Sequence, residues 1–363
     1  MRQPSGWREP TRYNDCVTLD QPAGALPGKG LATKLLVALV LGAIVFVGLS
    51  AYADFSAVLD GLGRFRWGYL PLVLGLTFLN YVLRFLKWQF YLRTIGVEGF
   101  PRRDSALVYF SGLGMVVTPG KVGEWLKCFL LRELHGTPVS RTAPIVIAER
   151  LTDSLAIVIL GGAGLVVFGD AWPAFVVVVV GAALFFFVVR HQPVAYWLLH
   201  RLERLPFVSR FAHHAEEFYG SSYALLSPYA LGSMTLLSVV SWGFEVLAFY
   251  VVLLGLGVDG GADLLLKASF IMPAATLASA LLLTPGGLGV AEGGITGLSQ
   301  VLIDLPKSDA AVGALVIRFG TLWFGVIVGL VAFAVVSRSL ARRQRPAAAS
   351  AEAALNLSAG VER

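Results

Sequence analysis

The chain has 363 residues, of which 56% are hydrophobic and only 14% are charged, and its formal net charge is +6. Soluble domains usually contain about 25% charged residues, so this composition excludes an ordinary water-soluble protein and favours one whose surface faces lipid. The excess of Lys and Arg does not indicate nucleic-acid binding, because the basic residues stand in short stretches beside apolar runs, as on the cytoplasmic side of membrane proteins.

The N-terminal third begins with residues 1–30, which mix charges with Pro and Gly and predict a disordered cytoplasmic tail. Leu31–Tyr52 is apolar and long enough for a first membrane span. In Asp54–Trp67, apolar residues recur at helical spacing, which predicts an amphipathic helix lying on the membrane surface. Tyr69–Leu92 follows as the second full span and ends beside basic residues.

A polar stripe runs along this second span. Asn80, Arg84 and Lys87 are spaced so that they share one face of a helix near its cytoplasmic end. We interpret Lys87 as a side chain that extends to the membrane surface, which is the ordinary behaviour of lysine near a span end. Arg84 lies deeper and is therefore the better candidate for binding an anionic group.

The next apolar run, Ala106–Val117, is too short to cross a bilayer as a helix. It ends at Thr118-Pro119-Gly120, and basic residues follow as far as Arg141. This pattern predicts a re-entrant hairpin that enters from the cytoplasmic side. A single long, kinked span is the alternative.

Three further full spans are expected at Thr142–Phe168, Trp172–Val189 and Tyr229–Leu256, with a long basic loop at Arg190–Ser227. Only Gly169-Asp170-Ala171 separates the first two of these spans.

The C-terminal part resembles the hairpin region in its layout. Leu264–Leu283 is apolar and ends in a Pro-Gly turn, Gly289–Leu305 returns towards the surface, and Ala310–Val336 is the last span. Together the runs predict an all-α polytopic membrane protein with about six full spans and two re-entrant hairpins. The membrane domain is expected at 31–338 and a second disordered cytoplasmic tail at 339–363.

The distribution of charge predicts the orientation in a cell membrane. Basic residues near the span ends place both termini in the cytoplasm. The loops at 53–68, 169–171, 257–263 and 303–309 then face outward, and these loops are predominantly acidic.

Two segments share a pattern that predicts an inverted-topology repeat. T-P-G-K-V-G-E ends at Glu124 and T-P-G-G-L-G-V-A-E ends at Glu292, and the same number of residues separates these from Arg150 and Arg318. The expected orientation brings the first hairpin in from the inside and the second from the outside, with repeat halves at about 69–189 and 228–336. Transporters with such repeats bind substrate near the bilayer midplane. The alternative is that both turns are only kinks or close-packing sites.

Five charged residues fall inside expected spans: Glu149, Arg150, Asp153, Glu245 and Arg318. Each costs about 2.5–3.5 kcal/mol at a helix centre on insertion scales, so they are expected to face one another, water or a ligand. A structural network of ion pairs between spans is one interpretation. A binding site is the other.

The residue types favour an anionic headgroup. Helix starts after Gly-rich turns present backbone N–H groups to anions, and Arg84, Arg150 and Arg318 would add positive charge for a phosphate. Glu124, Glu245 and Glu292 would contact cationic groups or take up protons. No catalytic constellation, metal spacing or cofactor motif is present, so we expect no catalytic residues, no metal and no cofactor.

In combination, T-P-G-K-V-G-E-W-L-K, A-E-R-L-T-D-S-L and T-P-G-G-L-G-V-A-E-G-G resemble the membrane domain of lysylphosphatidylglycerol synthases, over about residues 31–338. The resemblance implies a flippase-like protein that moves a charged phospholipid between leaflets. It implies functional roles for the matching positions Glu124, Glu149, Arg150, Asp153, Pro285, Gly286, Gly287, Gly289 and Glu292. Bifunctional members carry a soluble aminoacyl-transferase domain after the spans. This chain stops shortly after Ser337, so we expect no synthase activity.

These observations predict a lipid translocase, not an enzyme, whose substrate has an anionic or zwitterionic headgroup. A proton-coupled transporter of a small solute is an alternative, and a non-transporting membrane partner of a lipid-modifying or glycosyl-transferring enzyme is another. A homo-oligomer or such an enzyme is the expected protein partner, and no nucleic acid is expected.

Overall fold

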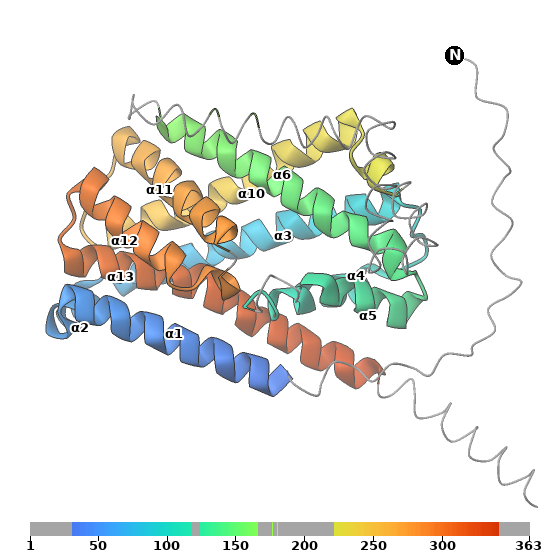
Figure 1. Ribbon diagram of the computed structural model, residues 1–363, viewed down its shortest axis with the longest axis horizontal. Helices are drawn as coiled ribbons and strands as arrows, with labels where there is room; N and C mark the ends of the chain where they lie inside the picture. The colour runs from blue at the N-terminus through green and yellow to red at the C-terminus, as the bar shows by residue number, and fades with distance from the viewer. Residues whose placement is uncertain are drawn as a thin grey trace, which may run out of the picture.

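The computed structural model describes residues 31–117, 124–165, 176, 180, 221–282 and 284–340, and their regular secondary structure is helical throughout (Figure 1). This confirms the expected all-α class. The main helices are α1 (Leu31–Ala53), α2 (Phe55–Arg64), α3 (Leu70–Thr94), α4 (Arg102–Leu113), α5 (Leu126–His135), α6 (Val139–Leu165), α10 (Pro228–Gly255), α11 (Ala262–Leu281), α12 (Val290–Ile303) and α13 (Lys307–Arg318).

Three short helical segments join these helices. The 3₁₀ segments η1 (Trp67–Tyr69) and η4 (Pro285–Gly287) precede α3 and α12, and the π-helical segment η5 (Phe319–Trp323) continues α13, so that one helix runs from Lys307 to Leu340. Several predictions lie outside the described residues: the tail at 1–30, the turn at 118–120, nearly all of the span at 172–189, most of the loop at 190–227, and the second tail beyond residue 340.

A sharp break separates α1 from α2. The two helices are bent by 100°. Between them Asp54 has φ 70°, and its carboxylate accepts a hydrogen bond from the backbone N–H of Ser56 at 3.0 Å, which caps the start of α2. The predicted amphipathic segment after the first apolar run is therefore a separate helix, and its Gly61 packs against Val312 of α13.

Four helices of the described residues are long and apolar enough to cross a membrane, or up to five if the bent α1–α2 pair is one span. The four are Trp67–Thr94, Pro228–Gly255, Ala262–Leu281 and Lys307–Leu340. With 27 residues α6 also has the length, but Glu149, Arg150 and Asp153 lie in its middle. The chain is thus a multi-pass membrane protein, whereas the number of spans and the two hairpins remain predictions.

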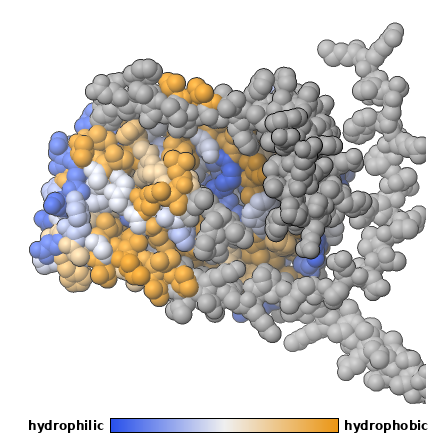
Figure 2. All heavy atoms as spheres, viewed as in Figure 1, coloured by the Kyte–Doolittle hydropathy of each residue, from blue (hydrophilic) through white to orange (hydrophobic). Residues whose placement is uncertain are grey.

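The helix directions in Figure 1 divide the molecule into two ends. α1, α6 and α10 run towards the end at which α2 lies, and α3 and α13 run away from it. At the α2 end, the backbone N–H of Arg66 donates to the Gly255 carbonyl at 3.0 Å, which ties the start of α3 to the end of α10. Figure 2 shows a hydrophilic surface at this end and a mostly apolar surface over the adjoining middle of the molecule, as expected for a protein embedded in lipid.

Two apolar clusters lie one after the other along the helices. One holds Val73, Val246–Leu253 and Ala311–Ile317 near the α2 end. The other holds Trp88–Val97 and Val336 towards the opposite end. Arg84 and Lys87 of α3, Glu245 of α10 and Arg318 at the end of α13 lie between these clusters, so these charges form a layer in the middle of the helix bundle.

Candidate functional site: a charged cavity in the helix bundle

A cavity of about 160 Å³ lies within this charged layer. Residues from α3 to α6 and from α10 to α13 contribute to its wall, which mixes apolar, aromatic and charged side chains. Eight of the twelve predicted site residues line it: Arg84, Glu124, Glu149, Arg150, Glu245, Gly286, Gly287 and Arg318. Asp153, Pro285, Gly289 and Glu292 do not line the cavity; Asp153 and Glu292 pair with Arg84 and Arg318, which do, Pro285 precedes Gly286, and Gly289 is two residues from Gly287.

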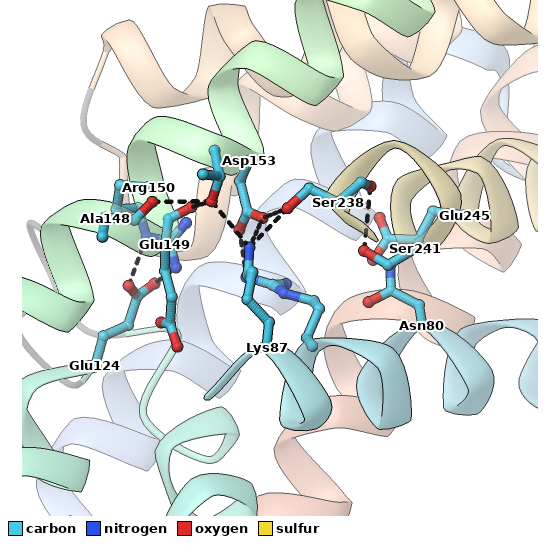
Figure 3. Close-up of polar contacts among 12 residues, drawn as sticks. Asn80, Lys87, Glu124, Ala148, Glu149, Arg150, Asp153, Ser238, Ser241 and Glu245 are labelled. Atoms are coloured by element: carbon cyan, nitrogen blue, oxygen red, sulfur yellow. Dashed lines mark hydrogen bonds and ion pairs between the residues drawn. The ribbon is translucent and has the colours of Figure 1, made fainter. Parts of the chain in front are cut away.

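The three charged residues in the middle of α6 pair with other segments rather than with one another, and Figure 3 shows this for Arg150 and Asp153. Glu149 pairs with Lys127 of α5, Arg150 pairs with Glu124, and Asp153 pairs with Arg84 of α3 at 2.8 Å. A buried ion needs such a partner because the desolvation of an unpaired charge costs several kcal/mol. These pairs therefore tie α6 to the elements around it.

Two Glu–Arg pairs repeat the same separation of 26 residues. Arg150 Nε donates to Glu124 Oε2 at 2.7 Å, and its Nη2 contacts the other carboxylate oxygen. Arg318 Nε donates to Glu292 Oε1 at 2.7 Å. The Glu and Arg residues whose equal spacing the sequence showed are therefore paired with each other, a contact that the sequence analysis did not predict.

The second pair is built into the turn before α12. Gly286, Gly287 and Gly289 have positive φ values of 61°, 73° and 84°, which glycine adopts without steric cost. The backbone N–H of Gly289 donates to Glu292 Oε2 at 2.7 Å, and Arg318 Nη2 donates to the Gly286 carbonyl at 2.5 Å. The start of α12, which the sequence suggested for an external anion, therefore already has the Glu292 carboxylate as its anionic partner.

Asp153 accepts from several donors at the centre of the network. Besides Arg84, it contacts Lys87 Nζ, and Ser238 Oγ donates to its Oδ1 at 3.0 Å. The side chain of Lys87 is only 1% exposed. The interpretation of Lys87 as a residue that extends to the membrane surface is therefore wrong, because its ammonium group is satisfied inside the bundle by Asp153 and Ser238.

Glu245 differs from the other buried acids. It is 8% exposed, and its Oε1 accepts from Asn80 Nδ2 at 3.0 Å. Among the described residues it forms no ion pair, whereas Glu124, Glu149, Asp153 and Glu292 each have a cationic partner. Arg84 stacks on the ring of Trp242 at 5.6 Å, one turn before Glu245 on α10, so a cation lies near it without contacting it.

The charges in and next to the cavity balance. In the part of the chain that the structure describes, the cations are Arg84, Lys87, Lys127, Arg150 and Arg318, and the anions are Glu124, Glu149, Asp153, Glu245 and Glu292. No cluster of three or more potential metal-ligating His, Cys, Asp or Glu side chains is found in that same part. The arrangement is suited to binding a charged organic group through ion pairs and hydrogen bonds.

Sequence reasoning missed Lys127, Tyr81, Tyr109 and Trp242, all of which line the cavity. A signal for Lys127 was present, because it stands three residues after Glu124 in the T-P-G-K-V-G-E-W-L-K motif and a helix would bring the two to one side. The aromatic residues gave no comparable signal, since aromatic side chains are common throughout the apolar runs.

Comparison with known proteins gives three findings. A family model described as the lysylphosphatidylglycerol synthase TM region matches residues 35–329. The chain is 26% identical over 298 residues to a UPF0104 membrane protein of Methanothermobacter thermautotrophicus, with 74% of this chain and 84% of the relative covered. It is 23% identical over 318 residues to the glycosyltransferase AglD of Haloferax volcanii, with 77% of this chain but only 51% of that protein covered.

Proposed function

The chain belongs to the lysylphosphatidylglycerol synthase transmembrane-region family, and from this premise we propose that it moves a lipid with a charged headgroup between the two leaflets of a cell membrane. The membership agrees with the resemblance in the sequence motifs. It concerns the membrane region of that family, so the proposal is for a lipid carrier rather than for an enzyme.

The cavity is the observation that carries the proposal. It lies between two apolar clusters in a multi-pass membrane protein, and it is lined by both signs of charge. Arg84, Arg150 and Arg318 all line it, and guanidinium groups are well suited to phosphate because they donate two parallel hydrogen bonds. A polar chamber in the middle of the bundle would lower the cost of bringing a headgroup through the hydrocarbon layer.

In the proposed mechanism, the headgroup enters the cavity while its acyl chains stay in lipid. The Arg150–Glu124 pair is the first to open, because the Arg150 side chain is 35% exposed and that of Arg318 only 15%. The guanidinium of Arg150 then exchanges the carboxylate for the lipid phosphate. Glu124, Glu245 and Glu292 would contact cationic or hydroxyl groups of the same headgroup.

We propose that the two motif segments form an inverted-topology repeat, with halves at about 69–189 and 228–336. The equal spacing of the two Glu–Arg pairs and their shared position at the cavity support this proposal. The hairpins would enter from opposite sides of the membrane, with both termini in the cytoplasm. Cysteine accessibility at the acidic loop residue Asp259 and at the basic residue Arg102, which starts α4, tests the orientation, because only Asp259→Cys is expected to react from outside.

A transport assay tests the proposed function. Purified protein is reconstituted into liposomes that contain lipids labelled on an acyl chain, and the appearance of labelled lipid in the opposite leaflet is followed. Wild type is expected to move at least one charged lipid faster than protein-free liposomes, and Arg150→Ala is expected to slow it. Arg64→Ala is the matched control, because Arg64 forms an exposed pair with Asp309 at the end of the molecule.

Equal, slow movement of every lipid with wild type and with Arg150→Ala would contradict a carrier function. The similarity to a glycosyltransferase then favours a second candidate, a non-transporting membrane partner of a glycosyl-transferring enzyme. In that case Arg150→Ala and Glu292→Ala would leave lipid movement unchanged and would alter the binding of the partner enzyme, which co-purification from membranes would detect.

A further inference from the structure

The ammonium group of Lys127 lies in a box made of two aromatic rings and one carboxylate. Its Nζ is 4.8 Å from the centre of the Trp88 ring and 5.7 Å from that of the Tyr109 ring, and it pairs with Glu149 Oε2. Aromatic faces attract cations through the ring quadrupole, and boxes of this kind bind organic ammonium groups in other proteins. Here the occupant is a side chain of the protein itself.

The box is held in place independently of Lys127. Trp88 Nε1 donates to Ser105 Oγ at 3.2 Å, and the Tyr109 ring packs against Trp88 with centroids 6.4 Å apart and against Phe85 at 5.7 Å. These contacts come from α3 and α4 and do not involve α5, which carries Lys127. The two rings would therefore keep their positions if Lys127 moved away.

Glu149 offers a place for a second donor. The residue is 4% exposed, and its buried Oε1 has no hydrogen-bond partner among the residues that the structure describes, although Oε2 contacts Lys127. A buried carboxylate oxygen without a donor is unfavourable. Glu149, Tyr109 and Lys127 all line the cavity, so a ligand inside it lies next to this carboxylate.

The charge balance restricts which ligand fits. Among the described residues, the five cations and five anions in and next to the cavity carry no formal net charge to neutralise a headgroup that is only anionic or only cationic. A headgroup with one negative and one positive group avoids this cost, because it separates an existing ion pair and gives each member a new partner. The lysine then pairs with the phosphate of the headgroup, and the carboxylate pairs with the ammonium group of the headgroup.

We propose that the box of Trp88, Tyr109 and Glu149 is the ammonium subsite of the cavity, and that the substrate carries a phosphate joined to an alkylammonium group. Lys127 is the tethered occupant of this subsite. The incoming ammonium group replaces it, and Lys127 then contacts the phosphate. This inference rests on the proposed lipid movement and narrows it from charged headgroups in general to zwitterionic ones.

The closing experiment compares a phospholipid headgroup that carries an ammonium group with two headgroups that lack it. Liposomes containing the protein carry acyl-labelled phosphatidylethanolamine, its N-acetylated form, which keeps the phosphate but lacks the ammonium group, or phosphatidylglycerol. Wild type is expected to move phosphatidylethanolamine about twofold to thirtyfold faster than the other two, which is the range that one cation–π contact spans. Equal rates for the three lipids would overturn the inference while leaving the proposed lipid movement intact.

Variants connect this preference with the box. Glu149→Gln is expected to remove the preference for phosphatidylethanolamine, because the amide has no charge to attract the ammonium group. Lys127→Met is expected to increase it, since the box is vacated. The double variant, Glu149→Gln with Lys127→Met, restores the local charge balance and serves as the folding control. Lys267→Met is a second control, because it removes an ion pair on α11 that does not line the cavity. A preference that persists unchanged in Glu149→Gln and in the double variant would also overturn the assignment.

A soluble competitor distinguishes whether the subsite binds the headgroup of a lipid or a free molecule that has the same phosphate and ammonium groups. Phosphoethanolamine at increasing concentration is expected to slow the movement of phosphatidylethanolamine in wild type and to have a weaker effect in Glu149→Gln. If no lipid moves but phosphoethanolamine still raises the thermal stability of wild type and not that of Glu149→Gln, the subsite stands and the proposed lipid movement fails. Absence of both effects contradicts the subsite.

Discussion

The pair Glu292–Arg318 and the pair Glu124–Arg150 have the same spacing in the sequence but are held differently. Glu292 also accepts from the Gly289 backbone N–H, and Arg318 also donates to the Gly286 carbonyl. Glu124 and Arg150 make a two-point contact with each other, and the Arg150 side chain is more than twice as exposed, at 35% against 15%. The first pair is part of the backbone turn before α12, whereas the second is accessible from the cavity side.

This difference suggests a division of roles between two similar elements. Opening the Glu292–Arg318 pair would release hydrogen bonds of the turn as well as the ion pair, which makes it costly to exchange for a ligand. Opening the Glu124–Arg150 pair releases only the two side chains. We therefore expect that Glu292–Arg318 mainly stabilises the fold and that Glu124–Arg150 mainly serves substrate binding.

The largest effect on stability is expected for Glu292→Ala. The substitution leaves the guanidinium of Arg318 without its carboxylate in a buried site and removes the acceptor for the Gly289 N–H. Breaking a buried pair in this way costs about 3–5 kcal/mol in the free energy of unfolding. Thermal unfolding of the detergent-solubilised protein, followed by tryptophan fluorescence, measures the loss.

Glu124→Ala is the matched variant for this comparison. Its partner Arg150 is more exposed than Arg318, and Glu124 accepts no backbone hydrogen bond among the described residues, so we expect a smaller loss in the free energy of unfolding than for Glu292→Ala. The transport rate should respond differently from the stability. For each kcal/mol of unfolding free energy lost, Glu124→Ala should lose more transport rate than Glu292→Ala. Equal destabilisation by the two variants would contradict the division of roles.

A loss smaller than that of Glu292→Ala is expected for Gly286→Ala, which changes the turn without touching either charge. Gly286 has φ 61°, and a Cβ atom there would lie 2.8 Å from Val117 Cγ1. A left-handed conformation costs an L-residue about 1–2 kcal/mol, and the contact with Val117 adds to this. The same unfolding assay detects the change, and Gly297→Ala is the control, since a Cβ atom at that exposed helical position meets nothing within 4 Å. A neutral Gly286→Ala would mean that the turn does not hold the Arg318 pair.

The sequence was informative about elements whose signal is local. The change of pattern at Asp54 predicted the separate helix α2, and the recurrence of Glu, turn and Arg marked Arg150 and Arg318 as equivalent positions, although their pairing with Glu124 and Glu292 was not predicted. Partners on different helices could not be predicted in this way. Helical periodicity gives the face on which a residue lies but not which neighbouring helix meets that face, so the Lys127–Glu149 and Asn80–Glu245 contacts were missed.

The error at Lys87 has the same origin. A lysine near the end of a span usually extends to the membrane surface, and only the position of α10 and α6 against α3 shows that Ser238 and Asp153 satisfy it internally. The sequence therefore predicted which types of residue form the candidate site and roughly how deep along the membrane spans they lie. Its pairing, its aromatic wall and its balance of charge arise from packing between helices.

The smallest loss in the free energy of unfolding is expected when the pair of Arg64 and Asp309 is broken. This exposed pair is the reference for the two Glu–Arg pairs. It joins α2 to the start of α13 at 3.3 Å, with side chains that are 70% and 25% exposed. Exposed ion pairs contribute about 0.2–1 kcal/mol because water and salt screen them, so Arg64→Ala should lower the free energy of unfolding by no more than about 0.5 kcal/mol. The difference should shrink further in high salt, which unfolding at two ionic strengths measures. A loss as large as that of Glu124→Ala would show that exposure does not rank these pairs, and the argument that separates the two Glu–Arg pairs would lose its physical basis.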